Sequence, residues 1–258
     1  MTALIDGDSM IFMLGYVHRE HQNIEEMYKS VDTFLENIFI QTGADTYYGA
    51  IAGPCKCFRY DIYKVKEYKG IRPELSEYME FWRPVISDYL KDKWKFDWPK
   101  NALQGEADDL IFGAAHDCKD NGLEFVVCSP DKDLRTIAGM HFDYRKNEFV
   151  TVDVDQARYN FFTLILAGDD TDNIAGIPGY GPKKTKDKLW PLLEQKAETS
   201  SYEALVRSLY HKHFGEYYGN IVYHETKKTV SLMWDQQRKL QFYAVPREPH
   251  PFDILSGD

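Results

Sequence analysis

The sequence predicts an α/β fold in which a mostly parallel central sheet is flanked by helices. Short apolar runs that end in acidic residues, or in Gly-Pro and Ser-Pro pairs, are typical of buried strands followed by loops. Such runs lie at residues 3–5, 46–52 and 124–128. Between them lie helical patterns of a length that suits crossover connections, at roughly residues 24–41, 74–91 and 106–120. This alternation of strands and helices indicates an α/β fold.

The first apolar run, residues 3–5, is interrupted at once by Asp6 and Asp8. It is therefore too short for a signal peptide or a membrane span, and no later run approaches about 20 apolar residues. We accordingly expect a cytoplasmic protein without a membrane segment.

The alternation of strands and helices fades after about residue 160. The chain then reads as helix, glycine turn and helix, followed by a helical part rich in tyrosine and lysine. We therefore expect an α/β domain at residues 1–160 and a helical region at residues 161–258.

Composition limits the class of protein. Hydrophobic residues make up 43% of the 258 residues and charged residues 28%, which is ordinary for a globular protein and excludes extensive disorder. The net charge of -10 argues at first against a polyanionic ligand, but an average hides local segregation of charge. The four cysteines lack the C-x-x-C spacing of a zinc site, and the eight histidines are scattered, so we expect structural or surface roles for both.

Acidic residues gather at the ends of the predicted elements. The four clusters are Asp6 and Asp8; Glu106, Asp108 and Asp109; Asp131 and Asp133; and Asp169 and Asp172. Helix capping or a solvated acidic face explains any one of them. Four clusters together imply bound metal, because ligands sit beyond the carboxyl ends of parallel strands and packed carboxylates repel one another unless cations neutralise them. Oxygen ligands suit Mg²⁺ or Mn²⁺, and two such ions about 4 Å apart can activate water and stabilise the leaving oxygen in phosphodiester hydrolysis.

Residues 56–72 form a basic segment within an acidic chain. Six basic and two acidic side chains give it a net charge of +4, with four aromatic residues interleaved. The basic residues are Lys56, Arg59, Lys64, Lys66, Lys69 and Arg72, and the aromatic ones are Phe58, Tyr60, Tyr63 and Tyr68. This pattern fits single-stranded nucleic acid, whose bases stack on rings with about 1 to 3 kcal/mol each. A solvated amphipathic surface is the alternative.

A glycine-rich turn at residues 176–181 precedes a helix start rich in lysine. Its glycines let backbone amides approach a phosphate closely. The lysines that follow are Lys183, Lys184, Lys186 and Lys188. We expect this element to hold a duplex backbone, although the turn by itself is also compatible with an ordinary loop.

In order and in wording, these motifs resemble the 5′-nuclease family of flap endonucleases and 5′-3′ exonucleases. The family has an Asp after the first strand, a Tyr-Lys-Gly-x-Arg element, a Glu-Ala-Asp-Asp helix start, an Asp-x-Asp loop and a Gly-Asp-x-x-Asp-Asn turn. The corresponding segments are Leu4-Ile5-Asp6-Gly7, Tyr68-Lys69-Gly70-Ile71-Arg72, Glu106-Ala107-Asp108-Asp109, Asp131-Lys132-Asp133 and Gly168-Asp169-Asp170-Thr171-Asp172-Asn173. The matches span residues 4 to about 189 and look most like stand-alone bacteriophage exonucleases.

The resemblance implies a PIN-like catalytic domain with a helical arch at about residues 56–100, and a helix-three-turn-helix motif in the DNA-binding C-terminal region. It implies a first metal ion held mainly by Asp6, Glu106, Asp108 and Asp109, and a second held by Asp131, Asp133, Asp169 and Asp172. Lys69 and Arg72 would contact the scissile phosphate and stabilise the transition state. The implied DNA contacts are Lys56, Arg59, Lys64, Lys66, Tyr68, Gly179, Gly181, Lys183 and Lys184. A K⁺ site on carbonyls of the 176–181 turn is a further family feature.

The chain departs from the family pattern after the second strand. The family carries a carboxylate there, several residues before the arginine that matches Arg59. This sequence reads Ile51-Ala52-Gly53-Pro54, without an acid. Asp8 can supply a replacement oxygen as a metal ligand, and a helix cap is the alternative role for it.

The function implied is hydrolysis of DNA from or near 5′ ends or flaps, with the RNA strand of an RNA–DNA hybrid as a further substrate. If the chain is phage-encoded, the host cytoplasm is its location. A haloacid-dehalogenase-type phosphatase is one alternative, because Asp6-Gly7-Asp8 also resembles its nucleophile and acid pair. A DNA-binding module with a decayed metal site is another, motivated by the missing acid.

Overall fold

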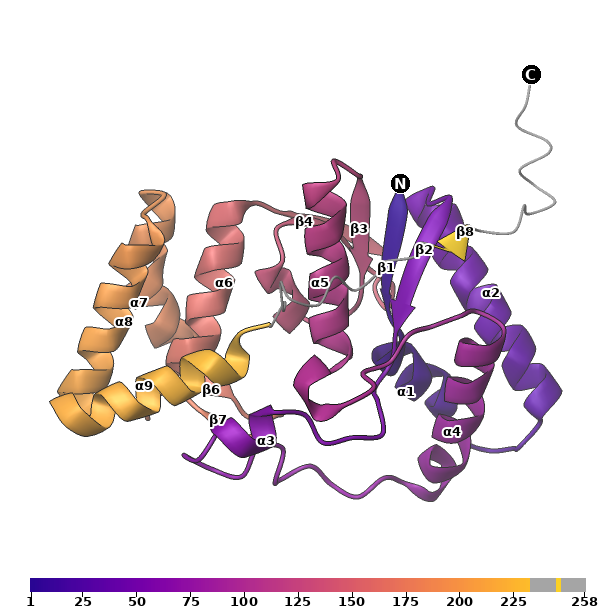
Figure 1. Ribbon diagram of the computed structural model, residues 1–258, viewed down its shortest axis with the longest axis horizontal. Helices are drawn as coiled ribbons and strands as arrows, with labels where there is room; N and C mark the ends of the chain where they lie inside the picture. Colours follow the sequence, from indigo (N-terminus) through magenta and orange to yellow (C-terminus); the bar gives the residue numbers. More distant parts are fainter. Residues whose placement is uncertain (233–244, 247–258) are drawn as a thin grey trace.

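The computed structural model describes residues 1–232 and 245–246, in which a central sheet lies between helices and continues on one side into a helical extension (Figure 1). The strands are β1 (Thr2–Asp6), β2 (Thr46–Ala50), β3 (Phe125–Cys128), β4 (Gly139–Asp143), β5 (Glu148–Val152) and β8 (Val245–Pro246). Their order across the sheet is β5-β4-β3-β1-β2-β8. Strands β2, β1, β3 and β4 are parallel, whereas β5 and β8 pair antiparallel at the two edges. The predicted α/β fold with a mostly parallel sheet is confirmed.

Helices cover both faces of the sheet and form the extension. They are α1 (Gly7–Val17), α2 (Ile24–Thr42), α3 (Arg59–Ile62), α4 (Glu77–Asp92), α5 (Ala107–Asp120), α6 (Val154–Ala167), α7 (Pro182–Glu194), α8 (Thr199–Phe214) and α9 (Glu216–Val230). The helices predicted at residues 24–41, 74–91 and 106–120 correspond to α2, α4 and α5. Within the described residues, no helix is both long and apolar enough to cross a membrane.

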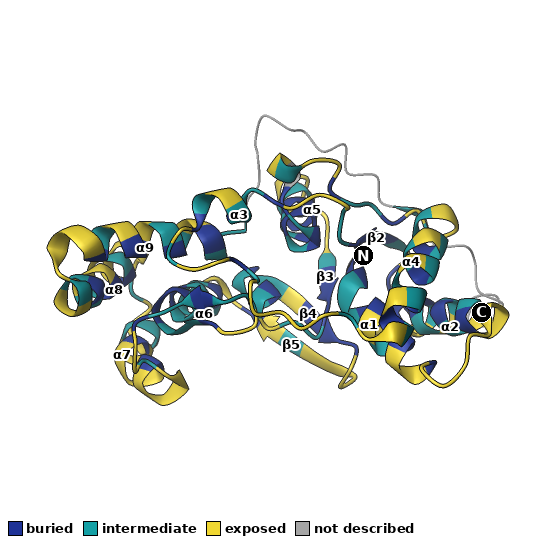
Figure 2. Cartoon of the chain, turned by 90° about the horizontal axis from the view of Figure 1, so that it is seen from below, coloured by how far each residue is buried: buried dark blue, intermediate teal, exposed yellow. Residues whose placement is uncertain are grey.

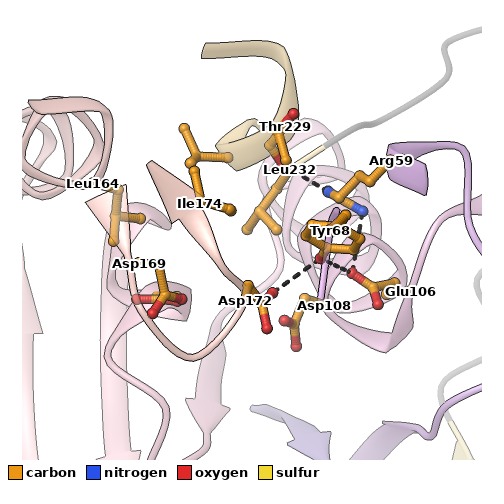
Figure 3. Close-up of a pocket in the computed structure, with 12 residues that line it drawn as sticks. Arg59, Tyr68, Glu106, Asp108, Leu164, Asp169, Asp172, Ile174, Thr229 and Leu232 are labelled. Carbon is orange, nitrogen blue, oxygen red and sulfur yellow. Dashed lines mark hydrogen bonds and ion pairs between the residues drawn. The ribbon is translucent and has the colours of Figure 1, made fainter. Parts of the chain in front are cut away.

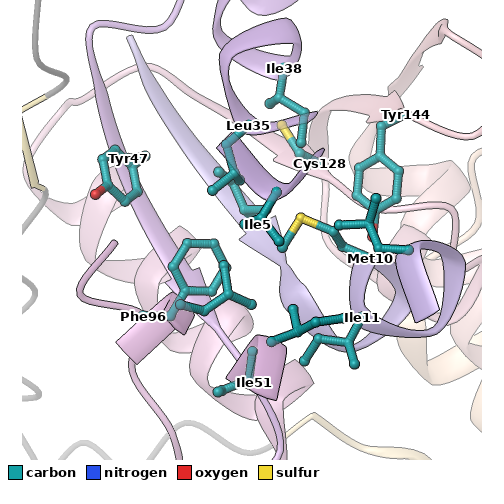
Figure 4. Packing of buried hydrophobic residues seen from close by; sticks show 14 of the residues in the cluster. Ile5, Met10, Ile11, Leu35, Ile38, Tyr47, Ile51, Phe96, Cys128 and Tyr144 are labelled. Atoms are coloured by element: carbon teal, nitrogen blue, oxygen red, sulfur yellow. The ribbon is translucent and has the colours of Figure 1, made fainter. Parts of the chain in front are cut away.

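Strand β1 lies at the centre of the sheet because it is apolar on both faces. Ala3 and Ile5 pack with α1, α2 and α4, whereas Leu4 packs with α5 on the opposite face, and all three are fully buried. Successive side chains of a strand point to opposite faces, so a continuous apolar run is what a strand covered on both sides requires. Figure 4 shows Ile5 among Met10 and Leu35 in the larger of these two layers.

Helix α1 and the β4–β5 hairpin were not among the predicted elements. Asp6 ends β1 and at the same time caps α1, since its side chain accepts hydrogen bonds from the amides of Asp8 and Ser9. An acidic residue that marks the end of a strand in the sequence therefore also starts a helix, without an intervening loop. The hairpin joins β4 and β5 in antiparallel register.

The segment expected to form a helical arch, at about residues 56–100, is helical only in α3 and α4. Between them, residues 63–76 form turns and extended chain that run below the sheet from α9 toward α4 (Figure 1). Tyr63 and Tyr68 are buried in a small cluster with Cys57 and Ile174. Because its aromatic side chains pack inward, this stretch lies against the body of the protein.

The helices α6 to α9 surround a separate hydrophobic cluster. Its buried members include Phe162, Tyr202 and Tyr210. Helix α6 crosses residue 160, so a division of the chain at that residue would cut a helix in two. A short hairpin of β6 (Gly168–Asp169) and β7 (Ile174–Ala175) connects α6 to the glycine turn and α7.

Candidate active site

Acidic side chains converge below the carboxyl ends of β1 and β3, where the start of α5 and the β6–β7 hairpin meet them. Glu106, Asp108, Asp133, Asp169 and Asp172 line one pocket (Figure 3). Asp6 and Asp131 complete the group, since both lie close enough to Asp108 to raise its pKa. We call these seven residues the acidic edge. Acids from four separate parts of the sequence thus meet in one place.

Hydrogen bonds fix the strand ends that carry the acidic edge. Asp6 Oδ1 accepts from the amides of Asp8 and Ser9, at 3.0 and 3.3 Å, and its Oδ2 accepts from the Ser129 hydroxyl at 2.7 Å. The same hydroxyl oxygen accepts from the Asp131 amide at 2.9 Å. Ser129 therefore links the ends of β1 and β3, a role that the sequence analysis did not assign although the residue stands beside the Asp131 motif.

The β6–β7 hairpin requires glycine at its base. Gly168 has φ +77°, and a Cβ atom there would lie 2.3 Å from both the Gly176 amide nitrogen and the Ile174 carbonyl oxygen. Only glycine fits this left-handed, close-packed position. The hairpin brings Asp169 and Asp172 to the pocket, and Asp169 Oδ1 accepts from the Thr171 amide at 2.9 Å.

The acidic edge is electrostatically strained without cations. Burial, followed by the charges of Asp131 and Asp169, raises the pKa of Asp133 to about 8. Burial and the neighbouring Asp6 and Asp131 raise the pKa of Asp108 well above its usual range. Asp133 Oδ1 is buried and has no hydrogen-bond partner. A set of oxygen donors with an orphaned buried atom and raised pKa values fits hard divalent cations such as Mg²⁺ and Mn²⁺.

Two cations lie directly over the pocket. The Lys69 ammonium pairs with Glu106 and lies 3.7 Å from Asp172 Oδ2, and the Arg72 guanidinium pairs with Asp172 Oδ1. Lys69 also donates its amide to the Asp172 carbonyl at 2.8 Å and takes a positive φ of 57°. Burial lowers the pKa of Lys69, but the charges of Glu106 and Asp172 outweigh it and the net shift is upward. Both side chains therefore remain charged beside the acids.

Asn173 holds this basic segment against the hairpin, because its side-chain amide donates to the Glu67 carbonyl at 2.8 Å. It also has a positive φ, of 56°, which asparagine tolerates better than most residues. Asn173 thus has a structural role that its place in the Gly-Asp-x-x-Asp-Asn motif does not by itself reveal.

Arg59 and Asp109 correct two of the predicted roles. They form a buried bidentate ion pair, with N–O distances of 2.6 and 2.8 Å, and are 3% and 2% exposed. Arg59 further donates to the carbonyls of Thr229 and Ser231, while Asp109 accepts from the Glu106 amide at 2.8 Å. Both Asp109 oxygens are thus occupied, so it is not placed as a metal ligand. Arg59 is buried at the edge of the same pocket and joins the start of α5 to the end of α9.

Tyr68 is a further correction, since it is 3% exposed and offers no ring surface for a base. Its hydroxyl lies 2.7 Å from Glu106 Oε2 and 2.9 Å from Asp172 Oδ2 (Figure 3). A phenol has one proton, so the hydroxyl can donate to only one of these acids at a time, and it serves the acidic edge rather than a nucleic-acid base.

Asp8 lies beside the position at which the sequence lacks an acid. Its Oδ1 accepts from the Ala52 amide at 2.8 Å, just beyond the end of β2. The cap of α1 is Asp6, which leaves Asp8 without the alternative capping role. Burial and the adjacent Asp6 charge raise the pKa of Asp8 to about 6. The Asp8 carboxylate therefore reaches the end of β2 from α1.

The remaining predicted DNA contacts are exposed and lie outside the acidic pocket. Lys56, Lys64 and Lys66 are on the basic segment, and Gly179, Gly181, Lys183 and Lys184 are on the glycine turn and the start of α7. In the view from below, α7 is exposed along most of its length (Figure 2), and only Thr185 and Leu189 of this helix are buried. Its lysines are therefore accessible.

Comparison with known proteins gives the site a context. A family model described as the 5′-3′ exonuclease N-terminal resolvase-like domain matches residues 1–161. DNA polymerase I of Bacillus subtilis is 34% identical over 166 residues, covering 55% of this chain and 18% of the polymerase. A 5′-3′ exonuclease of Aquifex aeolicus is 32% identical over 141 residues, covering 50% of this chain and 47% of that protein. The chain thus spans less than half the length of these two relatives.

A solved structure shares the fold across most of the chain. The bacteriophage T5 flap endonuclease, crystallised in a complex with DNA and metal ions, superposes with a TM-score of 0.54. The superposition covers 90% of this chain and 99% of that one, at 17% sequence identity. The likeness extends beyond residue 161 and so includes the helical extension. None of these matches is to a phosphatase of the kind considered as an alternative.

Proposed function

The chain belongs to the 5′-3′ exonuclease family, and from that premise we propose that it is a structure-dependent nuclease that hydrolyses DNA from or near 5′ ends or flaps. The observation that carries the proposal is the convergence of seven carboxylates beneath the paired cations Lys69 and Arg72. Acids alone could bind a cation for structural reasons. Acids that can bind metal ions, together with two cations that pair with them, suit a phosphodiester whose phosphorus is attacked by water while the bond to the leaving oxygen breaks.

The acidic edge would hold two Mg²⁺ or Mn²⁺ ions. Glu106, Asp108 and Asp6 would hold one ion, and Asp131, Asp133, Asp169 and Asp172 the other. The two groups adjoin, since Asp131 raises the pKa of both Asp108 and Asp133. When bound, the ions would supply an activated water and neutralise charge on the phosphate and the leaving oxygen. Asp133, with its orphaned oxygen, is the strongest single candidate for a ligand.

Lys69 and Arg72 would bind the non-bridging oxygens of the scissile phosphate. Lys69 and Arg72 pair with Glu106 and Asp172, which are acids that a metal ion would bind. Metal binding would therefore release the Lys69 and Arg72 side chains. The released charges then face the pocket, where they can stabilise the negative charge that develops in the transition state.

Asp8 would replace the missing acid after β2. Its carboxylate is held by the Ala52 amide, so it lies where a side chain from the end of β2 would otherwise project. A carboxylate whose pKa is raised by a neighbouring acid is also one that a cation would stabilise in its charged form. The missing acid after β2 would then be replaced by Asp8, a metal ligand supplied by α1.

Nucleic acid would be held by two exposed surfaces. Lys56, Lys64 and Lys66 would follow the 5′ strand, and the turn at residues 176–181 with Lys183 and Lys184 would clamp the duplex backbone in the manner of a helix-three-turn-helix motif. Carbonyls of this turn would bind K⁺. We extend the substrate to the RNA strand of RNA–DNA hybrids, and we propose the α/β part as the catalytic domain and the helical part as the DNA-binding region.

Cleavage of a 5′-labelled flap duplex and a blunt duplex, with Mg²⁺, Mn²⁺ or chelator, tests the proposal. Helix α5 offers a matched pair of variants, since Asp108 lies at the pocket and Asp120 at the far, exposed end. Asp108→Asn should abolish cleavage, whereas Asp120→Asn should not alter it. Metal-independent cleavage, or equal activity in the two variants, would refute the assignment. Binding of the flap without cleavage under every metal condition would support a non-catalytic DNA-binding module.

A further inference from the structure

A second group of potential metal ligands lies at the opposite end of α1 from the acidic edge. His18 caps the C-terminal end of α1, His21 follows in the connection, and Glu26 is in the first turn of α2. One ligand atom from each of the three lies within 4.8 Å of the others, and His21 Nε2 is 4.0 Å from Glu26 Oε2. With 11 residues in α1, this cluster is roughly 16 Å from Asp6.

One ring nitrogen of His18 is fixed by a hydrogen bond, and the other has no partner, as in many metal-binding histidines. It is 4% exposed, and its Nε2 lies 2.9 Å from the Ser30 hydroxyl, while its buried Nδ1 has no hydrogen-bond partner. Metal-binding histidines commonly use one ring nitrogen for the metal and fix the other by a hydrogen bond. Burial lowers the pKa of His18, which favours the neutral ring that metal binding requires.

The backbone around the cluster is fixed on both sides. Trp82 of α4 donates its indole N–H to the His18 carbonyl at 3.0 Å, and its ring lies edge-on to the His18 ring at 5.9 Å between centroids. Asn23 caps α2 by accepting from the Glu26 amide at 3.2 Å. Only the exposed side chains of His21 and Glu26 need to move, by about 1.5 Å or less, to reach the ligand spacing of about 3.4 Å around a tetrahedral ion.

We propose that His18, His21 and Glu26 bind one Zn²⁺-like transition-metal ion that joins the end of α1 to the start of α2. Two imidazole nitrogens and a carboxylate suit Zn²⁺, Co²⁺ or Ni²⁺ and discriminate against Mg²⁺, so the site differs in its metal from the acidic edge. A water completes the coordination. The role is structural, since the ion clips together two helices whose connection spans residues 18–23.

The proposal is independent of the nuclease function and is tested by binding. Zn²⁺ or Co²⁺ is titrated in excess Mg²⁺, which occupies the acidic edge, and bound metal, the visible absorption of Co²⁺ and tryptophan fluorescence are measured. Trp82 should be quenched by Co²⁺ because it packs on His18. At a hundredfold excess over Kd, Zn²⁺ should raise the unfolding temperature by roughly 5 °C or more.

Single substitutions decide the outcome. His21→Ala and Glu26→Gln change exposed side chains, so the fold should persist, and each should lower Zn²⁺ affinity by about tenfold or more. His213→Ala, on the exposed surface of α8, is the matched control and should bind as the wild type does. Equal Zn²⁺ binding and equal thermal shifts in His21→Ala and the wild type would overturn the proposal.

Discussion

The ion pair of Arg59 and Asp109 gives a direct test of whether Arg59 supports the fold or contacts DNA. Replacing Arg59 by Met keeps much of its apolar volume but leaves the Asp109 carboxylate buried without the guanidinium that neutralises it. Removing one partner of a buried ion pair costs about 3 to 5 kcal/mol. Arg59 also donates to two carbonyls near the end of α9, at 2.7 and 2.9 Å, so the loss should fall at the upper end of that range.

Urea unfolding and thermal denaturation measure the effect. For a chain of this size the unfolding temperature should drop by roughly 10 °C or more in Arg59→Met. The double variant Arg59→Met with Asp109→Leu should be more stable than Arg59→Met alone, because it also removes the buried carboxylate whose charge Arg59 neutralised. DNA affinity, measured at several salt concentrations in the folded protein, should keep its salt dependence.

The opposite pattern would refute this reasoning. If Arg59→Met kept its unfolding midpoint but bound DNA more weakly, with the slope of log K against log salt reduced by about one, Arg59 would be a phosphate contact. Lys64→Met is the matched control, because Lys64 is an exposed cation of the same segment. It should leave stability within about 0.5 kcal/mol and lower the salt slope.

Three further predictions follow from the site. Lys69→Ala should lower kcat for flap cleavage by about 10²-fold or more, whereas Lys66→Ala should mainly weaken binding, as single-turnover and titration assays would separate. Asp8→Ala should weaken Mn²⁺ binding in calorimetry, and adding Ala52→Asp to that variant should restore part of it; no recovery would argue against the relocated donor. Because the pKa of Asp133 is raised to about 8, the folded metal-free protein holds a proton that the unfolded chain loses. Stability in chelator should therefore fall as pH rises from about 4 to 8, while Mn²⁺ affinity should rise about tenfold or more from pH 6 to 8.

The strand ends and the start of α5 could be predicted from the sequence because hydrophobic patterning marks them. The rotation of α5 could not. Asp108 and Asp109 are adjacent, so on a helix they point about 100° apart, and one faces the pocket while the other faces Arg59. Which of the two acids faces the metal pocket depends on Arg59, which lies 50 residues from Asp109 in the sequence. No local sequence signal specifies that ion pair.

For a similar reason, the number of basic residues in the segment at 56–72 does not give the number of cations that face solvent. A count of charges treats all six cations as available, but Arg59, Lys69 and Arg72 are paired with acids of the site. Only Lys56, Lys64 and Lys66 of the six face solvent without such a pair among the described contacts. Tyr63 and Tyr68 likewise pack inward, so the stretch between α3 and α4 lies against the body of the protein.

These pairings suggest why the acidic edge can exist in a folded chain before any metal binds. Burial, followed by repulsion from neighbouring carboxylates, raises the pKa values of Asp108 and Asp133, which is a cost to folding at neutral pH. Lys69 and Arg72 offset that cost by pairing with Glu106 and Asp172. Lys69 and Arg72 are therefore held beside the pocket before the phosphate arrives. When metal ions bind the acids, they would replace these two side chains as the neutralising charges, and the side chains would then be free to bind the phosphate. Lys69→Ala should consequently destabilise the metal-free protein more than the Mg²⁺-bound protein, a difference that an electrostatically neutral role for Lys69 would not produce.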